Sequence, residues 1–159
     1  IDETFPQLRY EWKGNLKGLH IDSYKQYNYV DGYRIKINQL ASLPNYSQTE
    51  SNLNQPRLWY VNVGAYSKNS ISELHEFGLI VSSSSQSAKC LAKARYLKAA
   101  FRKHVDKCSQ IKFLTTLSSQ SSIDQYKHYE ISLIKVLETH QLDQGNSNPD
   151  WYGYKRIDK

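Results

Sequence analysis

The feature that most constrains the fold of this 159-residue chain is an internal repeat. The segment LHID at residues 19–22 returns as KHVD at residues 103–106. Each copy follows a helix-like stretch and precedes a run in which Tyr alternates with aliphatic residues, namely Tyr33, Ile35 and Ile37, then Tyr129, Ile131 and Leu133. The helix-like stretches correspond loosely, because aligning Phe5, Leu8 and Trp12 with Ala94, Leu97 and Phe101 needs a gap before the histidine. The pattern predicts two related structural units.

The second copy is the fuller one. Leu58–Ala65 alternates in polarity and predicts a strand, and Phe77–Val81 is apolar on both faces, which indicates a central, buried strand. Ser82–Ser87 supplies N-cap candidates for a helix whose expected apolar stripe is Cys90, Ala94, Leu97 and Phe101. Ile111–Leu114 and Tyr126–Val136 predict two further strands. One unit is therefore strand-strand-helix-strand-strand.

The first copy begins at its helix near Phe5, lacks the opening hairpin, and continues through expected strands at His20–Tyr27 and Val30–Ile37. We predict an α+β fold of two related halves, each an antiparallel sheet covered by one helix, with Trp12 and Phe101 buried. The expected organisation is a first repeat at residues 1–38, a linker at 39–56, a second repeat at 57–140 and a C-terminal arm or edge strand at 141–159. The sheet edge that the missing hairpin would leave open needs a cover. The aromatic arm, the linker or a second copy of the chain would supply it, the last of these in a homodimer.

Composition narrows the class of protein. No apolar run reaches the length of a membrane span, and the opening residues lack the basic and apolar regions of a signal peptide. The two cysteines, Cys90 and Cys108, are too few for a disulfide framework and form no Cys-x-x-Cys pair. We expect Cys90 to be a small core residue. These features predict a cytoplasmic protein that does not associate with membranes.

The net charge of +6 is concentrated in one segment. Residues 88–112 hold eight basic residues and one acid, Asp106, so we expect a basic helix whose face binds phosphates or acidic side chains. Tyr96 lies among these cations and could stack on a base. The candidate anion-binding residues are Lys89, Lys93, Arg95, Lys98, Arg102 and Lys103. The alternative is a solvated helix face whose long side chains cover apolar surface.

The duplicated His-x-Asp motif places an imidazole and a carboxylate on one face of a strand. Such a pair can contribute to a metal site, or act as a base and its orienting group. The candidates are His20, Asp22, His104 and Asp106, with His75 or Glu73 as a third group for the second copy. The alternative is a structural role, in which each histidine fixes the helix-to-strand junction by bonding the aspartate or the backbone. Duplication favours this alternative, because residues that hold a fold recur in every copy.

Several longer segments resemble one known family. FPQLRYEWKG, LHIDSYKQYNYVDGYRI and LWYVNVGAYSKNSISELHEFGLIVSSSSQSAKCLAKA are similar to the bacterial family called domain of unknown function 1543, whose members often carry the domain in two copies. The likeness covers Thr4–Ile37 and Arg57–Lys103. The second copy departs from the Val-Asp-Gly-Tyr element, since Gln125 follows Asp124. The resemblance implies a compact cytoplasmic protein and transfers no activity.

Motifs of nucleophilic catalysis and of phosphate loops are missing. No Gly-x-Ser-x-Gly occurs, and the glycines are scattered, so we expect no cofactor. The sequence therefore predicts a non-enzymatic binding module for a polyanionic partner, either a nucleic acid or an acidic protein. A metal-dependent or acid–base enzyme that uses the His-x-Asp pairs is the alternative.

Overall fold

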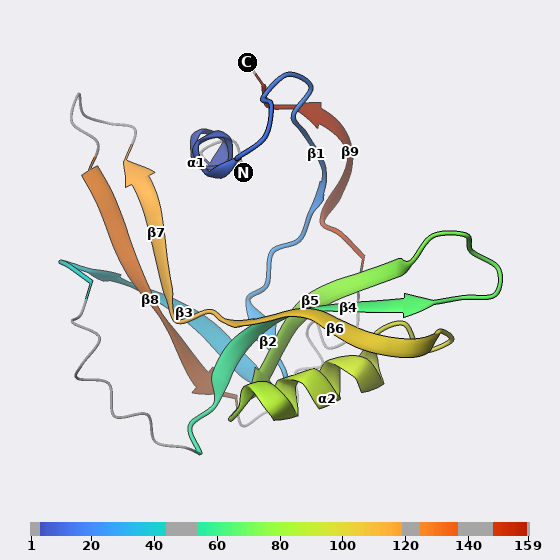
Figure 1. The fold of residues 1–159 in the computed structure, drawn as a ribbon. Coiled ribbons are helices and arrows are strands. Elements are labelled where there is room, and N and C mark those ends of the chain that lie inside the picture. The colour runs from blue at the N-terminus through green and yellow to red at the C-terminus, as the bar shows by residue number, and fades with distance from the viewer. Residues whose placement is uncertain (1–3, 44–53, 119–124, 137–147, 159) are drawn as a thin grey trace.

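The computed structural model describes residues 4–43, 54–118, 125–136 and 148–158, and the fold in this part of the chain is α+β (Figure 1). Its helices are α1 (Phe5–Glu11) and α2 (Ser85–Arg95). Its strands are β1 (His20–Tyr24), β2 (Tyr29–Val30), β3 (Tyr33–Leu40), β4 (Arg57–Tyr66), β5 (Leu74–Ser82), β6 (Phe101–Gln110), β7 (Phe113–Ser118), β8 (Gln125–Lys135) and β9 (Trp151–Arg156). They form antiparallel sheets in the orders β5-β4-β6, β2-β3-β8-β7 and β1-β9. None of the helices among these residues is long and apolar enough to cross a lipid bilayer.

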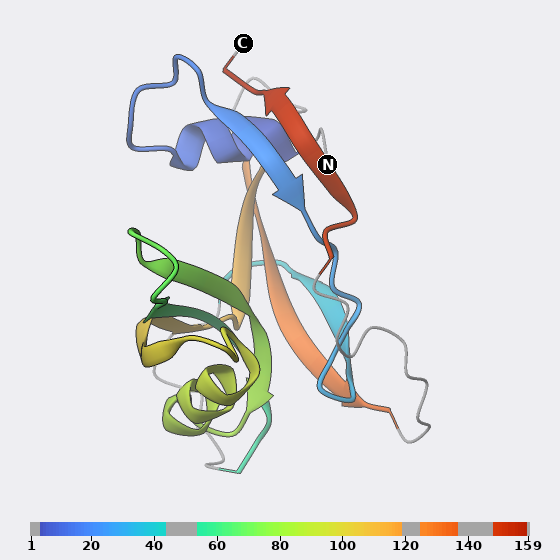
Figure 2. The same ribbon diagram turned by 90° about the vertical axis from the view of Figure 1, so that its right-hand side faces the viewer.

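The β5-β4-β6 sheet is covered on one face by α2 (Figure 2). Alternate residues of the central strand, Trp59, Val61 and Val63, form a buried cluster with Ile80 of β5. Ala88 and Ala92 complete the cluster from α2, and their small side chains let the helix lie close to the sheet. Ser84 caps the helix, because its side chain accepts a hydrogen bond from the Ser87 backbone N–H. An antiparallel sheet covered by one helix is thus present in this part of the chain.

The opposite face of this sheet packs against the β2-β3-β8-β7 sheet. Leu58 and Val81 point away from α2 and form a second buried cluster with Val30 of β2. The sheet that they meet contains strands from both predicted repeats, since β3 pairs along its whole length with β8. The two halves therefore do not each have a separate sheet, because long-range pairing joins them.

The turn between β2 and β3 also joins the two sheets. Asp31 and Gly32 both have positive φ, 51° and 79°, as a two-residue hairpin turn of type I′ requires. The Asp31 carboxylate accepts a hydrogen bond of 2.8 Å from the Val81 backbone N–H through Oδ2. Its Oδ1 lies 2.6 Å from Nη2 of Arg95 on α2. One turn residue thus holds the edge of β5 and the end of α2.

The segment predicted as a C-terminal arm or edge strand contributes one strand, which lies with β1 in a two-stranded sheet of its own. Its described part forms β9, which pairs antiparallel with β1, and Ile157 beyond it is buried. Asp158 fixes this ladder, because its Oδ2 accepts hydrogen bonds from the Gly18 backbone N–H at 2.7 Å and from Arg156 at 2.6 Å. Most of the predicted linker, residues 44–53, and the start of the arm, residues 141–147, lie outside the described residues.

Three expectations about the helices are wrong. Helix α2 ends at Arg95, before Leu97 with its positive φ of 49°. Phe101 instead begins strand β6 and is 44% exposed. Cys90 is exposed, since the buried face of α2 is formed by alanines at other positions. Helix α1 buries none of its residues, lies near β7 rather than across a sheet, and leaves Trp12 50% exposed.

The contact of Asp31 with both sheet edge and helix yields a stability prediction. Asp31→Gly keeps a residue suited to positive φ and removes both contacts. It should therefore lower the free energy of unfolding by about 2–3 kcal/mol. Asp31→Asn keeps an acceptor for the Val81 N–H and should cost about 1 kcal/mol or less. Chemical denaturation of the two variants measures both losses, and equal small losses would contradict the bridging role.

The β1–β9 ladder should loosen in acid. Hydrogen bonds from Arg156 and from the Gly18 backbone hold the pKa of the Asp158 carboxyl well below its usual range. Because the pKa of this carboxyl is lower in the folded than in the unfolded chain, its ionised form stabilises the folded state at pH values above the unfolded pKa of about 3.9. This stabilisation is lost as the pH falls through the pKa of the folded state.

Hydrogen-exchange protection of the Ile157 amide, which donates to the Leu19 carbonyl, should therefore decline below about pH 4 before that of Val63 in the core. Asp158→Asn should lower this protection at neutral pH and remove its acid dependence. Parallel pH profiles for the Ile157 and Val63 amides would contradict the prediction.

Candidate functional site

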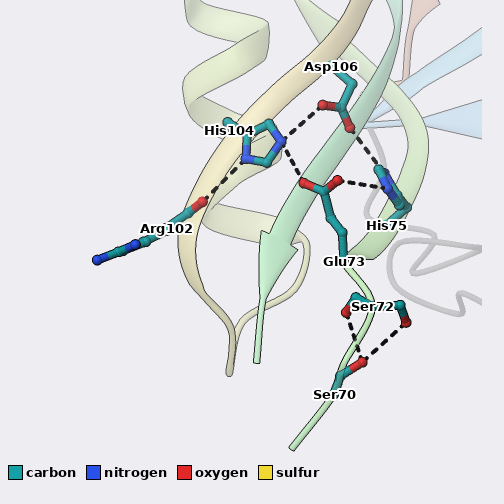
Figure 3. A network of polar contacts seen from close by, with 7 residues as sticks. All are labelled: Ser70, Ser72, Glu73, His75, Arg102, His104 and Asp106. Atoms are coloured by element: carbon teal, nitrogen blue, oxygen red, sulfur yellow. Dashed lines mark hydrogen bonds and ion pairs between the residues drawn. The ribbon is translucent and has the colours of Figure 1, made fainter. Parts of the chain in front are cut away.

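Four ionisable side chains gather on the face of the β5-β4-β6 sheet that α2 leaves uncovered (Figure 3). Val63 points into the core below α2, so the next residue, Gly64, faces the other way. His75 on β5 and His104 on β6 are both in register with Gly64. Glu73, just before β5, and Asp106 on β6 complete the group, which we call the His–carboxylate cluster.

The pairing of β6 with β4 is irregular on both sides of the β6 members of this cluster. The ladder passes from Val105 directly to Lys107 on β6, so Asp106 is the extra residue of a β-bulge. A second irregularity follows at the start of β6, where Arg102 has a positive φ of 52°. His104 and Asp106 are two residues apart, so the alternation of the strand already puts the Asp106 carboxylate on the side of the His104 imidazole. The bulge changes the face of the residues that follow, because Cys108 as well as Val105 packs against the cluster below α2.

The cluster is a closed ring in which imidazoles alternate with carboxylates. Nε2 of His104 lies 2.8 Å from Oε1 of Glu73 and 3.1 Å from Oδ1 of Asp106. Nδ1 of His75 lies 3.1 Å from Oδ2 of Asp106, and its Nε2 lies 3.5 Å from Oε2 of Glu73. The four side chains are 30–45% exposed, so solvent and solutes reach the ring.

This geometry does not favour histidine acid–base catalysis. A catalytic imidazole needs one ring nitrogen directed to the substrate while the other is held by an orienting group. Both nitrogens of His75 face carboxylate oxygens. Nδ1 of His104 lies 3.3 Å from the Arg102 carbonyl oxygen, and its Nε2 faces both carboxylates. In this arrangement, each ring nitrogen therefore faces an oxygen atom of the protein itself.

The first His-x-Asp pair has the same local geometry without the additional groups. Nδ1 of His20 lies 2.8 Å from the carbonyl oxygen of Gly18, two residues earlier, and Nε2 lies 3.2 Å from Oδ1 of Asp22, two residues later. Gly18 has a positive φ, as Arg102 has in the second copy. The further neighbour of His20 is the Tyr154 ring, with centroids 4.4 Å apart. Within the described residues, His20 and Asp22 contact no further imidazole or carboxylate.

The six candidate anion-binding residues do not lie on one helix. Lys89, Lys93 and Arg95 belong to α2, Lys98 follows it, and Arg102 and Lys103 begin β6. Arg95 pairs with Asp31, and Nζ of Lys103 donates to the carbonyl oxygens of Lys93 and Tyr96 at 2.9 Å. Within the described part of the chain, the side chains of the other four make no hydrogen bond or ion pair. We call these four, Lys89, Lys93, Lys98 and Arg102, the basic surface.

Tyr96 has a structural position rather than a place on the basic surface. It packs against the cluster below α2, and its hydroxyl lies so close to Gly78 that a side chain there would collide with it. Burial raises the pKa of the Tyr96 hydroxyl. The expected stacking of this ring on a base is therefore not available. Sequence reasoning missed Gly64, although a glycine inside a strand signals a close approach by another group.

Comparison with known proteins places the chain in a family. The family described as "Domain of Unknown Function (DUF1543)" matches residues 1–37 and 70–118, which is more than half of the sequence. The chain belongs to this family. It is also similar in structure to a protein Il1583 from Idiomarina loihiensis, with 27% sequence identity and a TM-score of 0.57 over 99% of this chain and 77% of that chain. No curated protein matches.

The different contacts of the lysines predict different effects on stability. Lys103 satisfies two carbonyl groups at the end of α2, so Lys103→Ala should lower the free energy of unfolding by about 1 kcal/mol. Lys98→Ala removes an exposed side chain and should change it by less than about 0.5 kcal/mol. Denaturant titration of both variants provides the measurement. Equal stability of the two would show that Lys103 does not cap the helix.

Proposed function

We propose that this protein is a binding module for a polyanionic partner and that it binds through the basic surface. The observation that carries the proposal is the separation of charges around α2 and β6. Arg95 and Lys103 are engaged internally, yet four cationic side chains form no ion pair with any of the described residues. Asp106, the one acid in residues 88–112, is held between two imidazoles in the cluster.

The lysines and the arginine suit phosphate or carboxylate groups better than a neutral ligand. The contact of Lys103 with the Lys93 carbonyl brings the start of β6 beside the end of α2, so the basic residues of both elements can act together. Four contacts to a nucleic-acid backbone would release counterions and give a slope of log K against log salt of about −3. An acidic protein offers the same charge complementarity with a weaker salt dependence.

Two other features bear on the location and the origin of the chain. Cys90 and Cys108 are both free thiols, as expected of a cytoplasmic protein. The matching junctions at His20 and His104 support an origin of the chain from two copies of one unit, each with its own His-x-Asp. We infer that the motif first served the fold and that only the second copy added neighbours.

Charge reversal tests the proposal. Lys93→Glu, Lys98→Glu and Arg102→Glu together should weaken binding of a labelled 20-nucleotide single strand at low salt by at least about tenfold, measured by fluorescence anisotropy. The matched control replaces three exposed lysines away from α2 and β6 by glutamate, and so makes the same change in net charge. These lysines are Lys13, Lys17 and Lys36. The control should weaken binding by less than about threefold.

A parallel titration with polyglutamate distinguishes the two partner classes. Binding of the oligonucleotide alone assigns a nucleic acid, whereas binding of polyglutamate alone assigns an acidic protein. Equal losses in the two triple variants would mean that total charge, not this surface, governs binding. No binding of either polyanion at low salt would overturn the proposal.

A further inference from the structure

The His–carboxylate cluster has a property that polyanion binding does not use. Nitrogen and oxygen atoms converge on the space above Gly64, where no side chain exists. A Cβ atom built on Gly64 would lie 2.6 Å from Nε2 of His104, 2.9 Å from Oδ2 of Asp106 and 2.9 Å from Oε1 of Glu73. One small region is thus bordered by three atoms that bind metals, contributed by two separate segments.

The orientation of the His104 ring also suits a ligand. Its Nδ1 lies 3.3 Å from the Arg102 carbonyl oxygen, a group that can only accept. Nε2, on the other side of the ring, is the nitrogen that faces the space above Gly64. A ligating histidine in metalloproteins usually donates its other N–H to such a carbonyl or to a carboxylate, which fixes the orientation of the ring.

One oxygen of the cluster lacks a satisfactory partner. Oε1 of Glu73 lies 2.8 Å from Nε2 of His104, but it is buried and has no aligned hydrogen bond within the described residues. A buried carboxylate oxygen without a donor is costly, and a bound cation would relieve that cost. The orphaned oxygen points to a cation as the missing partner.

We propose that the His–carboxylate cluster is a binding site for a divalent transition-metal ion, with His75, His104, Glu73 and Asp106 as ligands. Two imidazoles and two carboxylates favour zinc, with manganese, iron(II) and nickel as alternatives of the same class. The strand ladders hold the backbone around Gly64, and binding requires side-chain rotations that bring the ligand atoms to about 2.0–2.2 Å from one ion. As they stand, no three such side chains in the described ranges form a metal site, and the four pair with one another.

The site differs from the first His-x-Asp pair in what surrounds the motif. His20 and Asp22 contact a tyrosine ring, whereas His104 and Asp106 meet a second imidazole and a second carboxylate over a glycine. His20 therefore provides a matched control, because it has the same backbone contact and the same aspartate spacing.

Calorimetric titration of the full chain with zinc chloride tests the site. We expect one ion per chain, and at least about tenfold weaker binding in His104→Ala and in Glu73→Gln. Binding in His20→Ala should stay within about twofold of the unchanged protein. Gly64→Ala should also abolish binding, because the added methyl group occupies the space between the ligands.

Two further measurements keep the test decisive if a variant is destabilised. Circular dichroism checks that each variant is folded, and cobalt(II) added to the unchanged protein reports tetrahedral nitrogen and oxygen ligands through its visible absorption. No stoichiometric heat with zinc, manganese or nickel would overturn the proposal. Undiminished binding in folded His104→Ala and Glu73→Gln would place the ion elsewhere and overturn it as well. The basic surface is not involved in either result.

Discussion

The carboxylate of Asp31 is the contact on which the arrangement of the two larger sheets depends. It reaches from a tight turn of one sheet to the edge amide of Val81 in the other, and it pairs with Arg95 of the covering helix. Beside it, Val30, Leu58 and Val81 form the small apolar cluster between the sheets. An apolar cluster of three residues is non-directional, whereas two charge-assisted contacts from one side chain fix an orientation. The polar contacts thus define the docking angle, and the apolar cluster contributes most of the attraction.

That docking leaves the far end of the β5-β4-β6 sheet open, and this is where the His–carboxylate cluster forms. Helix α2 covers one face, and Leu58 and Val81 cover the near end of the other. Gly64 lies six residues along β4 from Leu58, beyond the reach of this second cluster. A polar group can persist there because solvent still reaches it. Arg102 of the basic surface lies two residues before His104 of the cluster on β6, and its side chain points away from the cluster (Figure 3).

Local patterns in the sequence predicted the parts of the fold that depend on local physics. The alternation of Leu58–Ala65 gave β4, and the serine run before α2 contains its cap, Ser84. The end of α2 was missed, because Leu97 adopts a positive φ that nothing in its side chain signals. The predicted apolar stripe of α2 included Cys90, but Ala88 and Ala92 face the sheet instead. Their small side chains fit the close approach of this helix. The His-x-Asp motifs and their third partners were recognisable as residues. Their convergence required the register of three strands and two bulges, which no local pattern encodes.

The pairing of β3 with β8 has a consequence for how the chain acquires its structure. Its paired residues are separated by 88 to 102 positions in sequence. Contacts of such long range cost loop-closure entropy before they contribute stability, and they slow folding. During synthesis, β3 emerges from the ribosome well before β8, and β2 is a partner of only two residues. Until β8 has been synthesised, one edge of β3 is unpaired, and other chains can join this strand with its apolar residues Ile35 and Ile37. Nascent chains of this protein therefore have a window, from the synthesis of β3 to that of β8, in which a holding chaperone would shield them from aggregation.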